Sequence, residues 1–144
     1  MEITNLNETD IIKVHRKCFD MIVFAGNYVM NFFEKAKQRN EIEGYTFTFE
    51  IYKKGYNIMV YSLGLPFNGD GLCDDYVYSI YANVIDSSDI KLKFVFGGFT
   101  KEVLLNANDS DGINESKIIE AIENNIKQLD SYNSEKVEFI NNKI

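Results

Sequence analysis

The stretch that decides the fold begins with GYTFTFEIYKKGYNIMVYSL at residues 44–63 and ends with YVYSIYANVIDSSDIKLKFVFGGFTKEVLL at residues 76–105. Apolar and polar residues alternate along much of both parts, and this is the pattern of strands that bury one face. Turn residues divide the stretch into expected strands at 44–53, 56–63, 76–85, 90–96 and 99–105. The sequence therefore predicts consecutive antiparallel strands.

The first hairpin is expected to turn at Lys54-Gly55, because glycine adopts positive φ at little cost. A two-residue turn there would set Ile51 opposite Ile58 and keep the apolar face aligned. The loop that follows, residues 64–75, is rich in glycine and aspartate and is long for a hairpin.

Two further connections set the rest of the register. Burial favours a loop over 85–89, which pairs Val84 with Ile90, rather than a two-residue turn at Ser87-Ser88. Gly97-Gly98 predicts a tight turn that sets Phe96 against Phe99, and one bent strand with a glycine bulge is the alternative.

Helices are expected on both sides of the strands. The first should run over residues 9–39, with Thr9 as its N-cap. Its apolar arc is about 200° wide, so we expect it to pack on two sides, against the sheet and against either the C-terminal helix or a second copy of the chain. The second should run over 115–131, capped by Asn114 or Asp111, before a polar tail at 132–144 that frays or docks as a last strand.

The element order is therefore α-β-β-β-β-β-α, which predicts one α+β domain over residues 1–144. It has two layers, an antiparallel sheet with both helices on one face. The residues expected to face the helices are Phe47, Phe49, Ile51, Ile58, Val60, Ile90, Leu92, Phe94 and Val103. The helix residues expected opposite them are Ile22, Val29, Ile122 and Ile126.

Composition narrows the class of protein. Hydrophobic residues make up 45% and charged residues 26% of the chain, which is typical of a globular domain. The net charge is -7, and the acidic excess lies in residues 62–144. With arginine only at positions 16 and 39, we expect a basic protein partner and no nucleic acid. The start MEITNLNETD does not resemble a signal peptide, and no apolar stretch has the length of a membrane span, so we expect a cytoplasmic protein without a membrane partner.

No motif assembles a catalytic or metal site. His15 and Cys18 have a spacing that could begin a metal site, but both lie on the apolar stripe, which favours a core pair. Cys73 stands beside Asp74 and Asp75, which would raise the pKa of its thiol and lower its reactivity. The loops at 68–71 and 108–112 resemble calcium loops but fit no EF-hand frame, which leaves a looser calcium site open. We expect no cofactor, no metal and no enzymatic activity.

The function that fits best is a small acidic protein that neutralises a protein partner by occupying its surface. An inhibitor, a toxin-immunity protein and a phage-type anti-defence protein all belong to this class. The residues expected to bind are Asp70, Asp74, Asp75, Asp109 and Asp111 in the loops, and Tyr52, Tyr61 and Tyr81 on the outer sheet face. The alternative is a dimeric escort, chaperone or assembly protein that pairs through helix 9–39.

Overall fold

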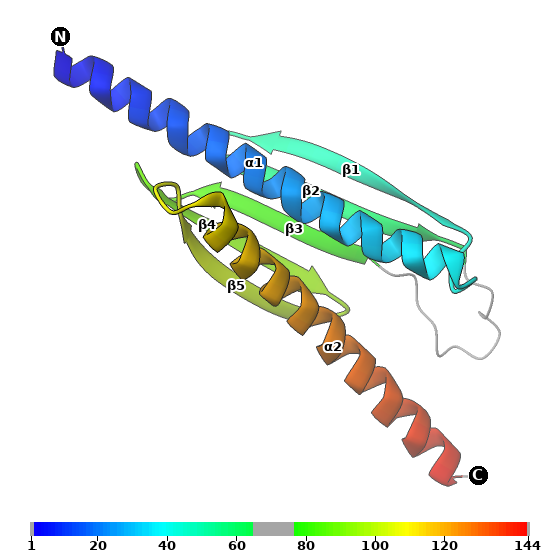
Figure 1. Ribbon diagram of the computed structural model, residues 1–144. Helices are drawn as coiled ribbons and strands as arrows, with labels where there is room; N and C mark the ends of the chain where they lie inside the picture. The colour runs from blue at the N-terminus through cyan, green and yellow to red at the C-terminus, as the bar shows by residue number, and fades with distance from the viewer. Residues whose placement is uncertain (1, 65–76, 144) are drawn as a thin grey trace.

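The structure is a computed structural model that describes residues 2–64 and 77–143, and the side chains of 11–64 and 77–131 (Figure 1). The elements are α1 (Glu2–Gln38), β1 (Gly44–Tyr52), β2 (Gly55–Leu63), β3 (Val77–Val84), β4 (Asp89–Phe96), β5 (Phe99–Asn106) and α2 (Asp111–Lys143). Asp70, Asp74 and Asp75, like Cys73, lie outside the described residues.

The strands form one antiparallel sheet in the order β1-β2-β3-β4-β5, so each strand pairs with its neighbour in sequence. Both helices lie on the same face of this sheet (Figure 1). The first helix packs mainly on β1, β2 and β3, and the second on β4 and β5. The predicted α+β order and the two-layer arrangement are confirmed.

The register of the last strands is also as predicted. Val84 pairs with Ile90, which is the arrangement expected of the longer loop between β3 and β4. Phe96 pairs with Phe99 across Gly97-Gly98, whose φ angles are 58° and 87°. The antiparallel ladder between β4 and β5 begins at this pair, so the two glycines form a two-residue turn and not a bulge in one strand. Glycine adopts their positive φ angles at little cost.

The first hairpin differs from the prediction by two residues. Tyr52 pairs with Gly55 and Phe49 with Ile58, so Lys53-Lys54 forms the turn. Gly55 is therefore part of the ladder and not of the turn. A Cβ at this position would lie 2.0 Å from the Ala82 carbonyl oxygen of β3, so no larger residue fits there without moving the strands apart. The glycine is needed for close backbone approach and not for the turn. A shift of two residues leaves every side chain on its expected face.

Both helices are longer than predicted. The first begins at Glu2, not at Thr9, and the second continues to Lys143, so the tail is helical and not a strand. No glycine or proline interrupts residues 2–25 or 113–143, and the helices therefore continue through polar sequence. The second helix also starts earlier than expected, with Ser110 as its cap: Ile113 N donates to Ser110 Oγ at 3.3 Å.

The core lies between the sheet and the two helices, and Ile22, Val29, Ile80, Phe94 and Ile122 are fully buried in it. The first helix packs on two sides as expected, on the sheet and on α2.

Four residues predicted for the core are not fully buried. Phe49 and Val103 are half-buried, and Phe47 and Ile51 are 50% and 73% exposed, although their register places them on the helix side of the sheet. The prediction of burial was wrong for Phe47 and Ile51 because they lie on an edge strand that α1 covers only in part.

Candidate protein-binding surfaces

The sheet face opposite the helices is one candidate surface, since no helix of the described chain covers it (Figure 1). Strand alternation and pairing place Tyr52, Tyr61 and Tyr81 together on this outer face, on three adjacent strands. All three were predicted to bind a partner from the sequence. The structure thus places the three tyrosines on one face, whereas Asp109 and Asp111 lie at one end of the sheet.

Neighbouring side chains hold the tyrosine rings in place. The Tyr52 hydroxyl donates to the Glu50 carboxylate, and this bond raises the pKa of the phenol. The Tyr61 hydroxyl lies 3.3 Å from Thr48 Oγ1. Lys93 Nζ lies 6.0 Å from the centroid of the Tyr81 ring, within range of a cation–π contact. Rings held in this way lose little rotamer freedom when they bind.

The centre of the outer face is neutral. Asn57 is buried there, and its Nδ2 donates to the Ile80 carbonyl at 3.0 Å. Ser79 is also buried. The charged side chains of this face are Glu50, Asp89, Lys91, Lys93 and Glu102, so both signs are interspersed and three carboxylates stand against two lysines. Lys91 pairs with Glu102 at 3.0 Å. The outer face therefore does not carry the acidity of the chain.

Four aspartates gather at one end of the sheet, where the turn before β4 meets the loop after β5. Ala107 N donates to the Ser88 carbonyl at 2.7 Å, and Asn106 Nδ2 donates to Asp89 Oδ1 at 3.1 Å. Asp86 accepts from the backbone N–H groups of Ser88 and Asp89, and these bonds lower the pKa of its carboxyl. We call the group Asp86, Asp89, Asp109 and Asp111 the acidic end.

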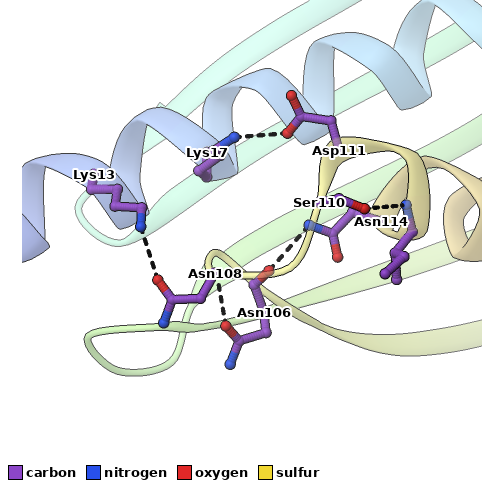
Figure 2. Close-up of polar contacts among 8 residues, drawn as sticks. Lys13, Lys17, Asn106, Asn108, Ser110, Asp111 and Asn114 are labelled. Carbon is purple, nitrogen blue, oxygen red and sulfur yellow. Dashed lines mark hydrogen bonds and ion pairs between the residues drawn. The ribbon is translucent and has the colours of Figure 1, made fainter.

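Two lysines of α1 reduce the charge of the acidic end (Figure 2). Lys17 Nζ forms an ion pair with Asp111 at 2.7 Å, and Lys13 Nζ donates to Asn108 Oδ1 at 2.9 Å. The sequence prediction of Asp111 as a bare contact residue missed this pairing, because the two residues are 94 positions apart. Asp109 forms no ion pair with a described residue.

A cavity of about 190 Å³ lies between the helices next to this ion pair, lined by Lys17, Asp20, Phe24, Glu115 and Ile118 among others. Asn114 also lines it, and its buried Oδ1 has no hydrogen-bond partner among the described residues. Among the described side chains, those of residues 11–64 and 77–131, no cluster of His, Cys, Asp and Glu has the geometry of a metal site.

The His15–Cys18 pair offers no reactive thiol. Cys18 is fully buried in the core, and burial raises the pKa of its thiol to about 12. A thiol is nucleophilic only as the thiolate, so Cys18 stays inert near neutral pH. His15 lies half-buried one turn earlier on α1.

A second candidate surface was missed by sequence reasoning. It is the exposed apolar flank formed by Ile12, Phe19 and Val23 of α1 with Phe47 and Ile51 of β1. The Phe19 ring packs against Phe49 of β1 at a centroid distance of 6.2 Å, which joins helix and strand along this flank. The apolar residues were visible in the sequence, but their exposure depends on β1 being an edge strand.

The chain matches no known protein family, no curated protein and no solved structure. In the described part of the chain, neither helix has the length and apolar character that crossing a membrane requires.

Proposed function

We propose that this protein is a small acidic, cytoplasmic binding protein that neutralises a protein partner by occupying its surface, as an inhibitor, an immunity protein or an anti-defence protein does. The observation that carries the proposal is the outer sheet face, which presents Tyr52, Tyr61 and Tyr81 from three adjacent strands and which no helix of the described chain covers. Tyrosine is enriched at the centres of protein interfaces.

The physical chemistry of this face suits tight binding. Each tyrosine offers a large ring with few rotatable bonds, and neighbouring side chains already fix the rings before binding. The charged side chains of the face are of both signs, and Lys91 is already paired with Glu102. A partner that covers the tyrosines and leaves these charges at the rim gains apolar contact without the cost of desolvating them.

The acidic end has a different role in this proposal. The net charge of -7 arises in residues 62–144, and Asp86, Asp89 and Asp109 add to it at one end of the sheet. Charges at the rim of an interface accelerate association with a partner of opposite charge, and they contribute less to the affinity of the complex. We therefore infer a basic partner that the acidic end attracts and that the tyrosine face holds.

The proposal is tested by co-purifying partners from the native source with the wild-type chain and with a Tyr52→Ser/Tyr61→Ser/Tyr81→Ser variant. Binding of the recovered partner is then titrated. We expect the tyrosine variant to weaken binding on the order of tenfold or more. Phe47→Ser is the matched comparison, because it removes an exposed ring from the other side of the sheet. Equal affinity of the tyrosine variant and the wild type would contradict the proposal.

Electrostatic attraction is tested separately with two variants, Asp109→Asn/Asp111→Asn and Asp70→Asn/Asp74→Asn/Asp75→Asn. Both should slow association and weaken its dependence on salt, while leaving the dissociation rate nearly unchanged. Because Lys17 already pairs with Asp111, most of the effect at the acidic end should come from Asp109. Unchanged association rates in both variants would remove the basic partner from the proposal.

The apolar flank favours a second candidate function, a dimeric escort or assembly protein. A client segment would then lie against Phe47 and Ile51 and not against the tyrosines. The Phe47→Ser and tyrosine variants separate the two candidate functions. For an escort protein, Phe47→Ser would abolish co-purification of the client and the tyrosine variant would not.

A further inference from the structure

The first strand is a free edge of the sheet. It pairs with β2 on one side, and in the strand order β1-β2-β3-β4-β5 no described strand lies on its other side. It has nine residues, no proline and one charged residue, Glu50. Proteins usually protect exposed edges with charges, proline, bulges or short strands, because an unpaired edge recruits another strand. This edge has little such protection.

The pairing pattern shows which backbone groups point outward from β1. Val84 N donates to the Lys54 carbonyl at 2.7 Å, so the even-numbered residues of β2 bond to β3. The odd-numbered residues of β2 therefore bond to β1, where their partners carry even numbers. The outward N–H and C=O groups of β1 belong to the odd-numbered residues Tyr45, Phe47, Phe49 and Ile51.

These same residues carry apolar side chains on the helix side of the sheet. Phe47 and Ile51 are 50% and 73% exposed, and the apolar flank continues onto α1 through Phe19 and Val23. The edge thus combines unused backbone hydrogen-bonding groups with an exposed apolar strip. A single partner strand placed beside β1 would satisfy both.

We propose that the partner strand is β1 of a second copy, paired antiparallel about a two-fold axis at Thr48. In this register the residue numbers of opposite partners add to the same value, so Phe47 faces Phe49 of the other copy and Tyr45 faces Ile51. Every outward residue then pairs with another outward residue.

Charge complementarity at the ends of the strand selects this register. Glu43 directly precedes β1 and Lys53 directly follows it, both are exposed, and the two-fold axis sets Glu43 of each copy opposite Lys53 of the other. A shift of the axis to Phe49 would set Lys53 against Tyr45, and a shift to Glu50 would oppose two carboxylates. The self-complementary charges are the reason for choosing a second copy over an unrelated strand.

The dimer would join the two sheets into one and leave the helices of both copies on the same face, because the two-fold axis is perpendicular to the sheet. The tyrosine faces of both copies would then lie on the opposite side. This inference does not depend on the proposed function, since it concerns the other side and the edge of the sheet.

The first test measures mass by sedimentation or light scattering from about 1 to about 100 µM. We expect a dimer of twice the 16.6 kDa chain mass. Ile51→Pro should dissociate it, because proline removes an outward N–H group and leaves the bonds to β2 intact. The matched control is Leu104→Pro, which also removes an exposed apolar residue with an outward N–H group, but from the opposite edge strand β5. That variant should remain dimeric.

The second test exchanges charges. Glu43→Lys and Lys53→Glu should each raise the dissociation constant of the dimer on the order of tenfold, and the double variant should restore it. Within one copy the two residues lie about 33 Å apart along an extended strand, so rescue requires contact between copies. A monomer at all concentrations overturns the proposal. So does a dimer that resists Ile51→Pro or shows no rescue, since that dimer would use another surface such as α1.

Discussion

Gly55→Ala is expected to weaken the sheet where β2 meets β3. A Cβ at this position would lie 2.0 Å from the Ala82 carbonyl oxygen and 2.7 Å from Asn83 Oδ1. Carbon and oxygen atoms need roughly 3.3 Å even in close contact, so the strands must move apart by about 1 Å. The clashing oxygen belongs to the backbone of β3, a central strand, so it cannot rotate away as the end of a flexible side chain could.

The size of the effect follows from the groups involved. Strain from an added methyl group in a packed region costs about 1–3 kcal/mol. Separation of the strands also weakens the nearby bond from Val84 N to the Lys54 carbonyl, and a net backbone bond contributes about 1 kcal/mol. Replacement of glycine by alanine offsets about 0.5–1 kcal/mol by restricting the unfolded chain. We therefore expect a loss of about 1–3 kcal/mol in the free energy of unfolding.

Gly44→Ala is the matched control. Gly44 begins β1, its φ is not positive, and no atom lies within 4 Å of a Cβ built on it. This variant should be about 0.5–1 kcal/mol more stable than the wild type. Urea unfolding measures both, followed by far-ultraviolet circular dichroism because the chain has no tryptophan. If Gly55→Ala and Gly44→Ala unfold at the same urea concentration, β2 and β3 do not approach each other as closely at Gly55 as the structure indicates.

Three other predictions concern the core, the acidic end and the buried thiol. Phe94→Ala should lower the free energy of unfolding by about 3–5 kcal/mol and Phe47→Ala by less than about 2 kcal/mol, because only Phe94 is fully buried. Equal losses for the two variants in urea unfolding would contradict the assignment of β1 as an edge strand. The pKa of Asp86 is lower in the folded chain than its ordinary value of 3.8, so its stabilising effect is present above that value and is lost as the pH falls further. Urea unfolding at about pH 7 and about pH 3 should therefore show a smaller acid loss in Asp86→Asn than in the wild type, and an equal loss would count against the turn geometry. In a Cys73→Ser background, Cys18 should react with a thiol reagent only when the chain unfolds; fast labelling of the folded chain would show that the thiol is accessible.

The fold could be predicted where a local signal and the tertiary structure agree. Gly97-Gly98 forms the turn that its sequence indicates, since two positive φ angles are needed there. Lys54-Gly55 also has the sequence of a turn, but Gly55 instead allows close backbone packing against Ala82, 27 residues later in the chain. Nothing near Gly55 in sequence distinguishes the two uses of glycine, so the register of the first hairpin could not be predicted.

The candidate surfaces could likewise be predicted only where they depend on local sequence pattern. Alternation along the strands was enough to place Tyr52, Tyr61 and Tyr81 on one face. Asp111 is paired with Lys17, and the exposure of Phe47 depends on how far α1 reaches across the sheet. Both are long-range properties that periodicity does not report.

Pairing of each strand with its sequence neighbour has a consequence for the order in which a growing chain can become stable. A β-sheet of this topology can extend one hairpin at a time, and short closures cost little chain entropy. The helix α1 is synthesised first, yet the strands that cover its apolar face come later, with β3 complete only at Val84. A ribosome-bound chain exposed only to the end of α1 should therefore be cut readily by protease within this helix, whereas in a chain exposed past β3 the helix should resist cleavage. Until β3 emerges, Ile22 and Val29 have no completed surface to pack against, so the apolar face of α1 stays exposed on the nascent chain during this interval.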